Sequence, residues 1–276
     1  MASTVHANAK AGYAKGTNEL YNLVRPRYQP EALSRLRQAI RTSEPLDVVE
    51  IGPGTGLFTR ALLAHPEWSS VRCLRAVEPS EGMREVFLKY TTDDRVLLSE
   101  GTFNTTGIES GWADLLAVAQ AFHWCLDYEA AAAEFARVLK PGGVLALIWN
   151  HEDRDAARWL NQVRERVERD EKCSPSWRTG LWRQIFSVPS YVKFFDQPEE
   201  QGFRYDVPGS LDAIVSRGLS SSRVSILPDS EKEQFKMDVK AIVQEAEDKV
   251  WIDEDKGTFK YPHFTDLVIS RRQSVI

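Results

Sequence analysis

Short apolar runs alternate with helix-like segments over residues 46–150, and this alternation restricts the fold of the chain more than any other feature of its sequence. Runs rich in β-branched or other apolar residues predict strands, and segments with apolar residues at helical spacing predict helices. The predicted strands cover residues 46–52, 71–79, 95–99, 113–121 and 144–150, and the predicted helices cover residues 57–64, 80–90 and 127–140. Strands and helices that alternate at this spacing form a parallel sheet with helices on both faces, so the sequence predicts an α/β, doubly wound fold.

The alternation ends after Asn150, and aromatic residues then become dense. Helical patterns cover residues 151–172, 211–219 and 230–250, and residues 257–272 predict a last strand. The aromatic residues between 177 and 205 are Trp177, Trp182, Phe186, Tyr191, Phe194, Phe195, Phe203 and Tyr205. Their density predicts the core of a helical cap or the wall of a largely apolar pocket, and the two interpretations are compatible.

Composition and charge exclude several classes of protein. Hydrophobic residues make up 42% and charged residues 27% of the 276 residues, which is typical of globular proteins. A net charge of −5 provides no basic surface for nucleic acid or for an anionic membrane. The cysteines at 73, 125 and 173 lack metal-ligand spacing, so we expect no metal and a reducing compartment. Since no segment resembles a membrane span or a targeting peptide, we expect a cytoplasmic protein.

A glycine-rich turn, EIGPGTG at residues 50–56, follows the first predicted strand. In a parallel sheet this turn lies at the carboxyl ends of the strands, where nucleotide-like ligands bind, although a tight strand-to-helix turn by itself also favours glycine. Leu57 stands where a dinucleotide fingerprint needs a third glycine. Glu50 would repel a pyrophosphate but suits an ammonium group, and Glu78, after the next strand, is placed to accept hydrogen bonds from both hydroxyls of a ribose.

Four segments in this order, VVEIGPGTG, AVEPSEGM, AVAQAFHW and RVLKPGGVL, resemble the class I S-adenosylmethionine-dependent methyltransferases. Residues 21–28 and the TFKYPHFTD segment are similar to trans-aconitate methyltransferase-like enzymes and to a fungal small-molecule branch that includes gliotoxin bis-thiomethyltransferases. The resemblance implies a Rossmann-like sheet of seven strands that binds S-adenosyl-L-methionine, leaves S-adenosyl-L-homocysteine as product and needs no metal. It also implies an N-terminal helical lid segment at 1–45, a cofactor-binding core at 46–150, and an aromatic-rich cap with C-terminal strands that complete the sheet at 151–276.

The resemblance assigns the cofactor to residues from several segments. The amino-acid part of the cofactor would be lined by Glu50, Gly52, Gly54 and Gly56, and its carboxylate would be covered by Tyr21 and Arg25. Glu78 would hold the ribose, Pro79 and Met83 would lie against the adenine, and Thr102 and Phe103 would lie at the adenine edge. Gln120 and Ala121 would lie where the methyl group emerges. An ordinary surface arginine is the alternative interpretation of Arg25.

The chemistry at the methyl group makes few demands on the protein. A methyl group on a sulfonium is already activated, so the protein mainly aligns a nucleophile and excludes water. His123 is the candidate general base for an alcohol or amine, and its alternative role is to shape the pocket. A thiolate or carboxylate acceptor needs no base. The residues expected to wall the acceptor pocket are Phe122, Trp124, Trp149, Trp177 and Trp182.

The sequence therefore predicts a methyltransferase that acts on a small molecule, as a monomer or homodimer. The first expectation is S-methylation of a thiol or dithiol secondary metabolite, and the second is carboxyl O-methylation of a small acid. Residues 120–123 replace the D/N-P-P-Y/F run typical of nucleic-acid amino methyltransferases, so we expect no nucleic-acid partner. A non-catalytic regulator that binds the cofactor and a nicotinamide-dependent reductase are the alternatives from other classes.

Overall fold

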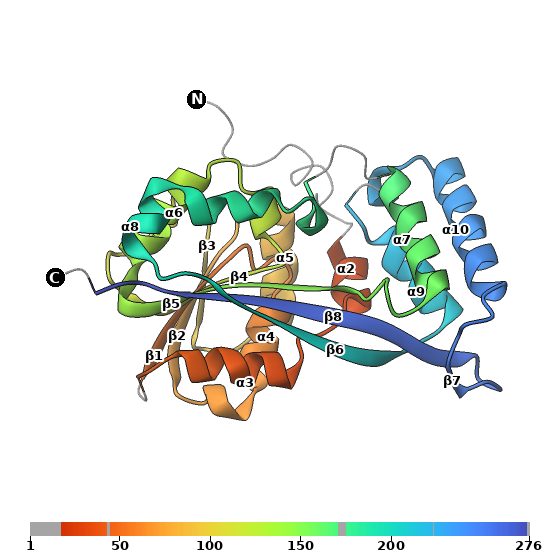
Figure 1. Ribbon diagram of the computed structural model, residues 1–276, viewed down its shortest axis with the longest axis horizontal. Helices are drawn as coiled ribbons and strands as arrows, with labels where there is room; N and C mark the ends of the chain where they lie inside the picture. The colour runs from red at the N-terminus through yellow and green to blue at the C-terminus, as the bar shows by residue number, and fades with distance from the viewer. Residues whose placement is uncertain (1–17, 43–44, 171–174, 223, 275–276) are drawn as a thin grey trace.

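A computed structural model describes residues 18–42, 45–170, 175–222 and 224–274. Its strands form one sheet in the order β3 (Val96–Ser99), β2 (Val71–Val77), β1 (Leu46–Ile51), β4 (Ala113–Ala119), β5 (Leu139–Glu152), β8 (Thr258–Arg271) and β6 (Glu199–Gly209) (Figure 1). The short β7 (Trp251–Asp253) pairs with β8 outside this path. Strands β1 to β5 pair in parallel, and β8 is antiparallel to both β5 and β6. The predicted Rossmann-like α/β fold is confirmed.

The central strands and the helices after them follow from local sequence. Every residue of β1 and β4 is buried, as expected for strands that are covered on both faces. The side chain of Ser80 accepts a hydrogen bond from the Met83 N–H and thereby caps α5 (Glu81–Tyr90). Asp127 caps α6 (Tyr128–Val138) in the same way. These caps fix where each helix begins relative to the strand before it.

Helices cover both faces of the sheet. On one face, α3 (Pro30–Ala39) and α4 (Leu57–Ala64) pack on apolar residues of β1, β2, β4 and β5. On the other face, α6 packs with the 3-10 helix η4 (Leu181–Ser187) and α8 (Pro189–Phe194). The carboxyl ends of β1, β2 and β4 stay free of these two layers and open toward the site described below.

A separate helical cap lies at one end of the long strands β6 and β8 (Figure 1). It consists of α7 (Arg158–Asp170), α9 (Leu211–Leu219) and α10 (Asp229–Gln244), which share a core with Phe259 and Tyr261 of β8. The helix α2 (Asn18–Val24) contacts both α9 of the cap and α5 of the sheet layer. This helix therefore joins the cap to the layer of the sheet that contains α5.

The structure corrects several predicted boundaries. Strand β5 begins at Leu139 and continues to Glu152, since His151 and Glu152 extend its ladder with β8. The predicted helix at 151–172 therefore begins only at Arg158, and the helix predicted to end at 250 ends at Gln244. The strands β6 and β7 were not predicted. The first four residues of β6 are exposed and apolar residues alternate only from Phe203 to Val207, while β7 has only three residues.

Part of the predicted lid segment, residues 1–17 and 43–44, lies outside the described residues, as does Cys173. Cys73 and Cys125 are free thiols. Within the described ranges, no helix is both long and apolar enough to span a lipid bilayer. The same ranges contain no group of three or more His, Cys, Asp or Glu side chains that could hold a metal ion.

Candidate functional site

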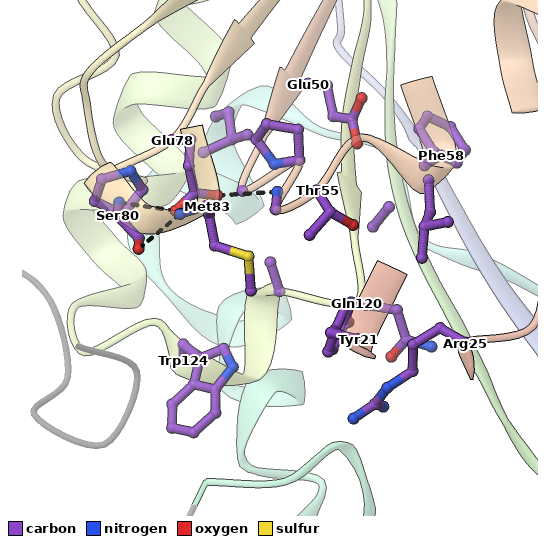
Figure 2. A pocket seen from close by; sticks show the side chains of 18 of the residues that line it. Tyr21, Arg25, Glu50, Thr55, Phe58, Glu78, Ser80, Met83, Gln120 and Trp124 are labelled. Carbon is purple, nitrogen blue, oxygen red and sulfur yellow. Dashed lines mark hydrogen bonds between the residues drawn. The ribbon is translucent and has the colours of Figure 1, made fainter. Parts of the chain in front are cut away.

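A cavity of about 520 Å³ lies at the carboxyl ends of β1, β2 and β4 (Figure 2). Its wall contains all but one of the predicted cofactor residues. These are Tyr21, Arg25, Glu50, Gly52, Gly54, Glu78, Pro79, Met83, Thr102, Phe103, Gln120 and Ala121. The fold thus brings the predicted residues from five separate segments of the sequence to one cavity, which we call the first cavity.

The glycine turn approaches the loop after β4 very closely. Gly52 has φ +71°, and a Cβ atom built on it would lie 2.6 Å from the Cβ of Ala121. No other residue fits this position without moving the wall of the cavity. The prediction for Gly56 is wrong, because this residue caps α4 at φ +85° and packs toward Thr91 and Phe87 outside the cavity.

Glu50 is a fully buried carboxyl group in the wall of the first cavity. Its Oε2 accepts a hydrogen bond from the Thr59 hydroxyl, whereas its Oε1 is buried without a hydrogen-bond partner among the described residues. Burial raises the pKa of Glu50 to about 8, although the Thr59 hydroxyl and the Arg60 charge act in the opposite direction. A buried carboxyl group with one orphaned oxygen is suited to a cationic ligand.

Glu78 lies at the end of β2 and is anchored by backbone amides. Its Oε2 accepts from the Gly54 N–H at 3.0 Å and its Oε1 from the Ser80 N–H at 2.9 Å (Figure 2). Burial raises the pKa of Glu78 to about 6 against the effect of these two bonds. Because each carboxylate oxygen accepts more than one hydrogen bond, both oxygens keep capacity for two hydroxyl donors.

A second cavity of about 400 Å³ adjoins the first. Five residues line both cavities, and they are Tyr21, Arg25, Gln120, Trp124 and Asn150. Gln120 has φ +57°, uncommon for a residue other than glycine, and its side chain donates a hydrogen bond to the Asn150 carbonyl. The Arg25 guanidinium lies 4.3 Å from the centre of the Tyr21 ring and donates to the Ser220 carbonyl at 2.9 Å, so it is part of this shared rim and not an ordinary surface arginine.

Comparisons with known proteins agree with this geometry. The family model described as "Methyltransferase domain" matches residues 49–147, which include the glycine turn and Glu78. An uncharacterised methyltransferase-like protein of Schizosaccharomyces pombe is 28% identical over 225 residues, which cover 81% of this chain and 83% of the relative. The chain contains a class I S-adenosylmethionine-dependent methyltransferase domain. The match covers the same part of the chain as the motifs recognised in the sequence.

Solved structures share the fold of this methyltransferase. The YcgJ protein of Bacillus subtilis has a TM-score of 0.54 at 18% identity, and the match covers 90% of this chain and 100% of that one. Phosphoethanolamine N-methyltransferase 2 of Haemonchus contortus, in complex with S-adenosyl-L-methionine, has a TM-score of 0.51 at 13% identity, covering 88% of this chain and 52% of that one.

The first cavity of the methyltransferase fits the cofactor that its fold implies. S-adenosylmethionine carries an ammonium group and a carboxylate at one end and a ribose with an adenine at the other. The orphaned Oε1 of Glu50 suits the ammonium group, and the Thr55 hydroxyl, also buried without a hydrogen-bond partner among the described residues, suits the carboxylate. Glu78 suits the ribose, with Met83 and Phe103 left as an apolar wall for the base.

His123 lines the second cavity but is a poor proton acceptor. Its Nδ1 accepts a hydrogen bond from the Trp149 indole at 3.3 Å, which leaves the proton of the neutral ring on Nε2. Burial, with a smaller contribution from the Arg25 charge, lowers the pKa of His123 to about 3. The geometry therefore favours a hydrogen-bond donor that shapes the pocket over a general base.

The predicted aromatic wall is wrong for three of its five residues. Phe122, Trp149 and Trp182 are fully buried in the core on the α6 side of the sheet, where Trp149 and Trp182 lie with ring centres 4.4 Å apart. Trp124 lines both cavities, and Trp177 lines the second. Most aromatic residues between 177 and 205 pack on one another, so the interpretation as the core of a packed layer holds for them.

Sequence reasoning missed several residues of the site. Thr55 lies inside the glycine turn, a position that could have been included with its neighbours. Tyr28, in the loop before α3, and Phe58, in α4, line the first cavity and contact each other edge to face, but a single aromatic residue in the sequence gives no signal of this role. The arginines of the second cavity, Arg154, Arg164, Arg178 and Arg217, looked like ordinary surface charges in the sequence.

Proposed function

We propose that this methyltransferase binds S-adenosylmethionine in the first cavity and transfers its methyl group to a small molecule in the second. In this arrangement Glu50 holds the ammonium group, Glu78 holds the ribose hydroxyls, and Tyr21 and Arg25 cover the carboxylate. When bound, the cofactor supplies a methyl group on a positively charged sulfur. The two adjoining cavities with a shared rim support this proposal, because transfer needs the two reactants in contact and away from water.

We further propose that the accepting atom is already ionised at neutral pH, as a thiolate or a carboxylate is. The observation that carries this step is the chemistry of the shared rim, where arginine, glutamine, asparagine, tyrosine and tryptophan side chains offer no effective base. His123 beside the rim is held neutral, and its Nδ1 accepts a hydrogen bond from the Trp149 indole N–H, so this nitrogen is not available to accept a proton from a substrate. His151 also lines the second cavity, but it lies outside the shared rim and its Nε2 is 2.9 Å from Oδ2 of Asp266. An alcohol or an ammonium group at the rim would therefore keep its proton.

The positive charge of the second cavity supports both thiols and carboxylic acids as methyl acceptors. Arginine side chains near a thiol lower its pKa and raise the thiolate fraction, and they attract a carboxylate directly. S-methylation of a thiol or dithiol metabolite and O-methylation of a small acid are thus the two candidate reactions. In both, Trp124 and Gln120 at the rim would exclude water and orient the acceptor.

A labelled-methyl transfer assay tests the proposal. The full chain is incubated with labelled S-adenosylmethionine and a matched panel of thiols, carboxylic acids, phenols, aliphatic alcohols and amines. We expect labelled product from thiols or acids at neutral pH and none from aliphatic alcohols or amines. Transfer confined to alcohols or amines would contradict the ionised-acceptor proposal, and binding of nicotinamide cofactors without any response to S-adenosylmethionine would contradict the proposal as a whole.

A further inference from the structure

The second cavity holds more arginine charge than the nearby carboxylates neutralise. Four of its arginines share two carboxylates, Glu152 and Glu168. The four are Arg154, Arg164, Arg178 and Arg217. Besides Glu152, the wall contains Asp153, which forms an ion pair with Arg204 at 2.9 Å, and Asp155. Asp155 and Arg178 are both exposed to solvent, where their opposite charges are screened, so Arg154, Arg164 and Arg217 remain against the two carboxylates. The cavity therefore has an excess of positive charge.

Arg217 is the most unusual of these cations because it is almost completely buried. It is 6% exposed, and its Nε lies 3.2 Å from Oε1 of Glu152 without the geometry of a hydrogen bond. Among the described residues its guanidinium makes no hydrogen bond. A guanidinium carries five N–H donors, and leaving buried donors unpaired costs free energy. A buried arginine in a cavity wall with open donors indicates an anionic ligand.

The position of Arg217 separates it from the place where the methyl group enters. Arg217 and Arg164 line the second cavity alone, whereas Gln120, Trp124 and Asn150 line both cavities. Arg217 belongs to α9 and Arg164 to α7 of the cap, and both approach Glu152 at the end of β5. The cap thus supplies a cationic end to a cavity whose other end meets the cofactor.

We infer that this cationic end is an anchoring site for a carboxylate of the methyl acceptor, which accepts hydrogen bonds from Arg217. The inference rests on the proposed function of the second cavity. A planar guanidinium matches the two oxygens of a carboxylate. A phosphate dianion fits less well, since Glu152 lies against the same guanidinium and repels a second negative charge more strongly. The acceptor is therefore a small organic acid whose anchoring carboxylate lies away from the transferred methyl group.

Titration calorimetry on the full chain saturated with S-adenosylhomocysteine tests this site. The probes are succinate, glutarate and adipate, the matching neutral diamides, and inorganic phosphate. We expect at least one dicarboxylate to bind at least about tenfold more tightly than its diamide and more tightly than phosphate, as is typical when charged hydrogen bonds are formed. Higher ionic strength should weaken this binding.

Substitutions of Arg217 test whether this residue binds the dicarboxylate. Arg217→Gln should lower the affinity for the dicarboxylate at least about tenfold and change the affinity for S-adenosylhomocysteine by no more than about twofold. Arg217→Lys keeps the charge that balances Glu152 but loses the planar guanidinium, so it should also weaken binding of the dicarboxylate. This variant tests the site if Arg217→Gln fails to fold. The matched control is Arg166→Gln, which removes a buried arginine of the same cap that pairs with Asp238 outside the cavity and should change neither affinity.

Three results would overturn the inference. They are equal binding of diacid and diamide by the wild-type complex, tighter binding of phosphate than of every diacid, and unchanged diacid binding in both Arg217 variants. In each case retained affinity for S-adenosylhomocysteine leaves the proposed methyltransferase reaction in place. Loss of that affinity in the wild-type chain would instead contradict the proposed function itself.

Discussion

Binding of S-adenosylhomocysteine should release a proton from Glu50. The carboxyl group is fully buried, and its pKa of about 8 means that roughly 0.9 of the molecules carry this proton at pH 7. An ammonium group placed against the orphaned Oε1 favours the ionised form, so the proton leaves as the complex forms. Because Glu78 has a pKa of about 6, it contributes only about 0.1 proton at this pH.

The sign of the pH dependence follows from the same shift. Below pH 8 the free protein binds a proton that the complex lacks, so higher pH favours the complex. The affinity should rise about tenfold between pH 6 and pH 7, with the increase becoming smaller as pH approaches 8. Glu78 acts in the same direction near pH 6, which makes the rise steeper at the acidic end.

Calorimetry at pH 7 in buffers of different ionisation enthalpy measures the released protons directly. We expect about 0.9 proton for the wild-type chain and close to none for Glu50→Gln, which has the same shape but no proton to release. The variant should also bind more weakly at pH 8 and show little change in affinity with pH. No proton release by the wild type, or equal release by the variant, would refute the role given to Glu50.

Three further predictions test other parts of the site. His123→Asn should leave the shape of the pH–rate profile between pH 5.5 and 8 unchanged, because the pKa of His123 lies near 3; loss of a limb near pH 6.5 would restore it as a base. Trp182→Ala should lower the free energy of unfolding by about 3–5 kcal/mol, whereas Trp177→Ala should cost much less, which denaturant unfolding of both variants can compare. Gly52→Ala should lower the affinity for S-adenosylhomocysteine, measured by titration, at least about tenfold, since a left-handed backbone conformation costs an alanine about 1–2 kcal/mol and its Cβ would meet Ala121. Unchanged affinity would mean that the turn does not contact the cofactor.

Much of the fold could be predicted because its signals are local. The helix at residues 57–64 follows a glycine turn, and the helix at 211–219 follows the capping Ser210, and both have the predicted bounds. Strand β6 was missed, since its first four residues are exposed and are held in the sheet by a ladder with β8 some sixty residues later. The extension of β5 through Glu152 has the same cause.

The first cavity could be predicted from the sequence to a greater extent than the second. The first is built from turns at the ends of adjacent parallel strands, so motifs such as the glycine turn and Glu78 identify it. The second depends on Arg164 and Arg217, which approach the end of β5 only after the cap has folded around its own core. Aromatic density was ambiguous for a similar reason, because sequence does not show whether Trp182 faces a core or a cavity.

The central claim is that the first cavity binds the methyl donor through Glu78. Calorimetric titration of the wild-type chain, Glu78→Gln and Glu78→Ala with S-adenosylhomocysteine, alongside NADH and NADPH, tests it most directly. We expect binding by the wild type, at least about tenfold weaker binding by both variants through the loss of charged hydrogen bonds, and no binding of either nicotinamide cofactor. Dissociation constants that stay within twofold across the three proteins, or NADPH binding without S-adenosylhomocysteine binding, would contradict the account.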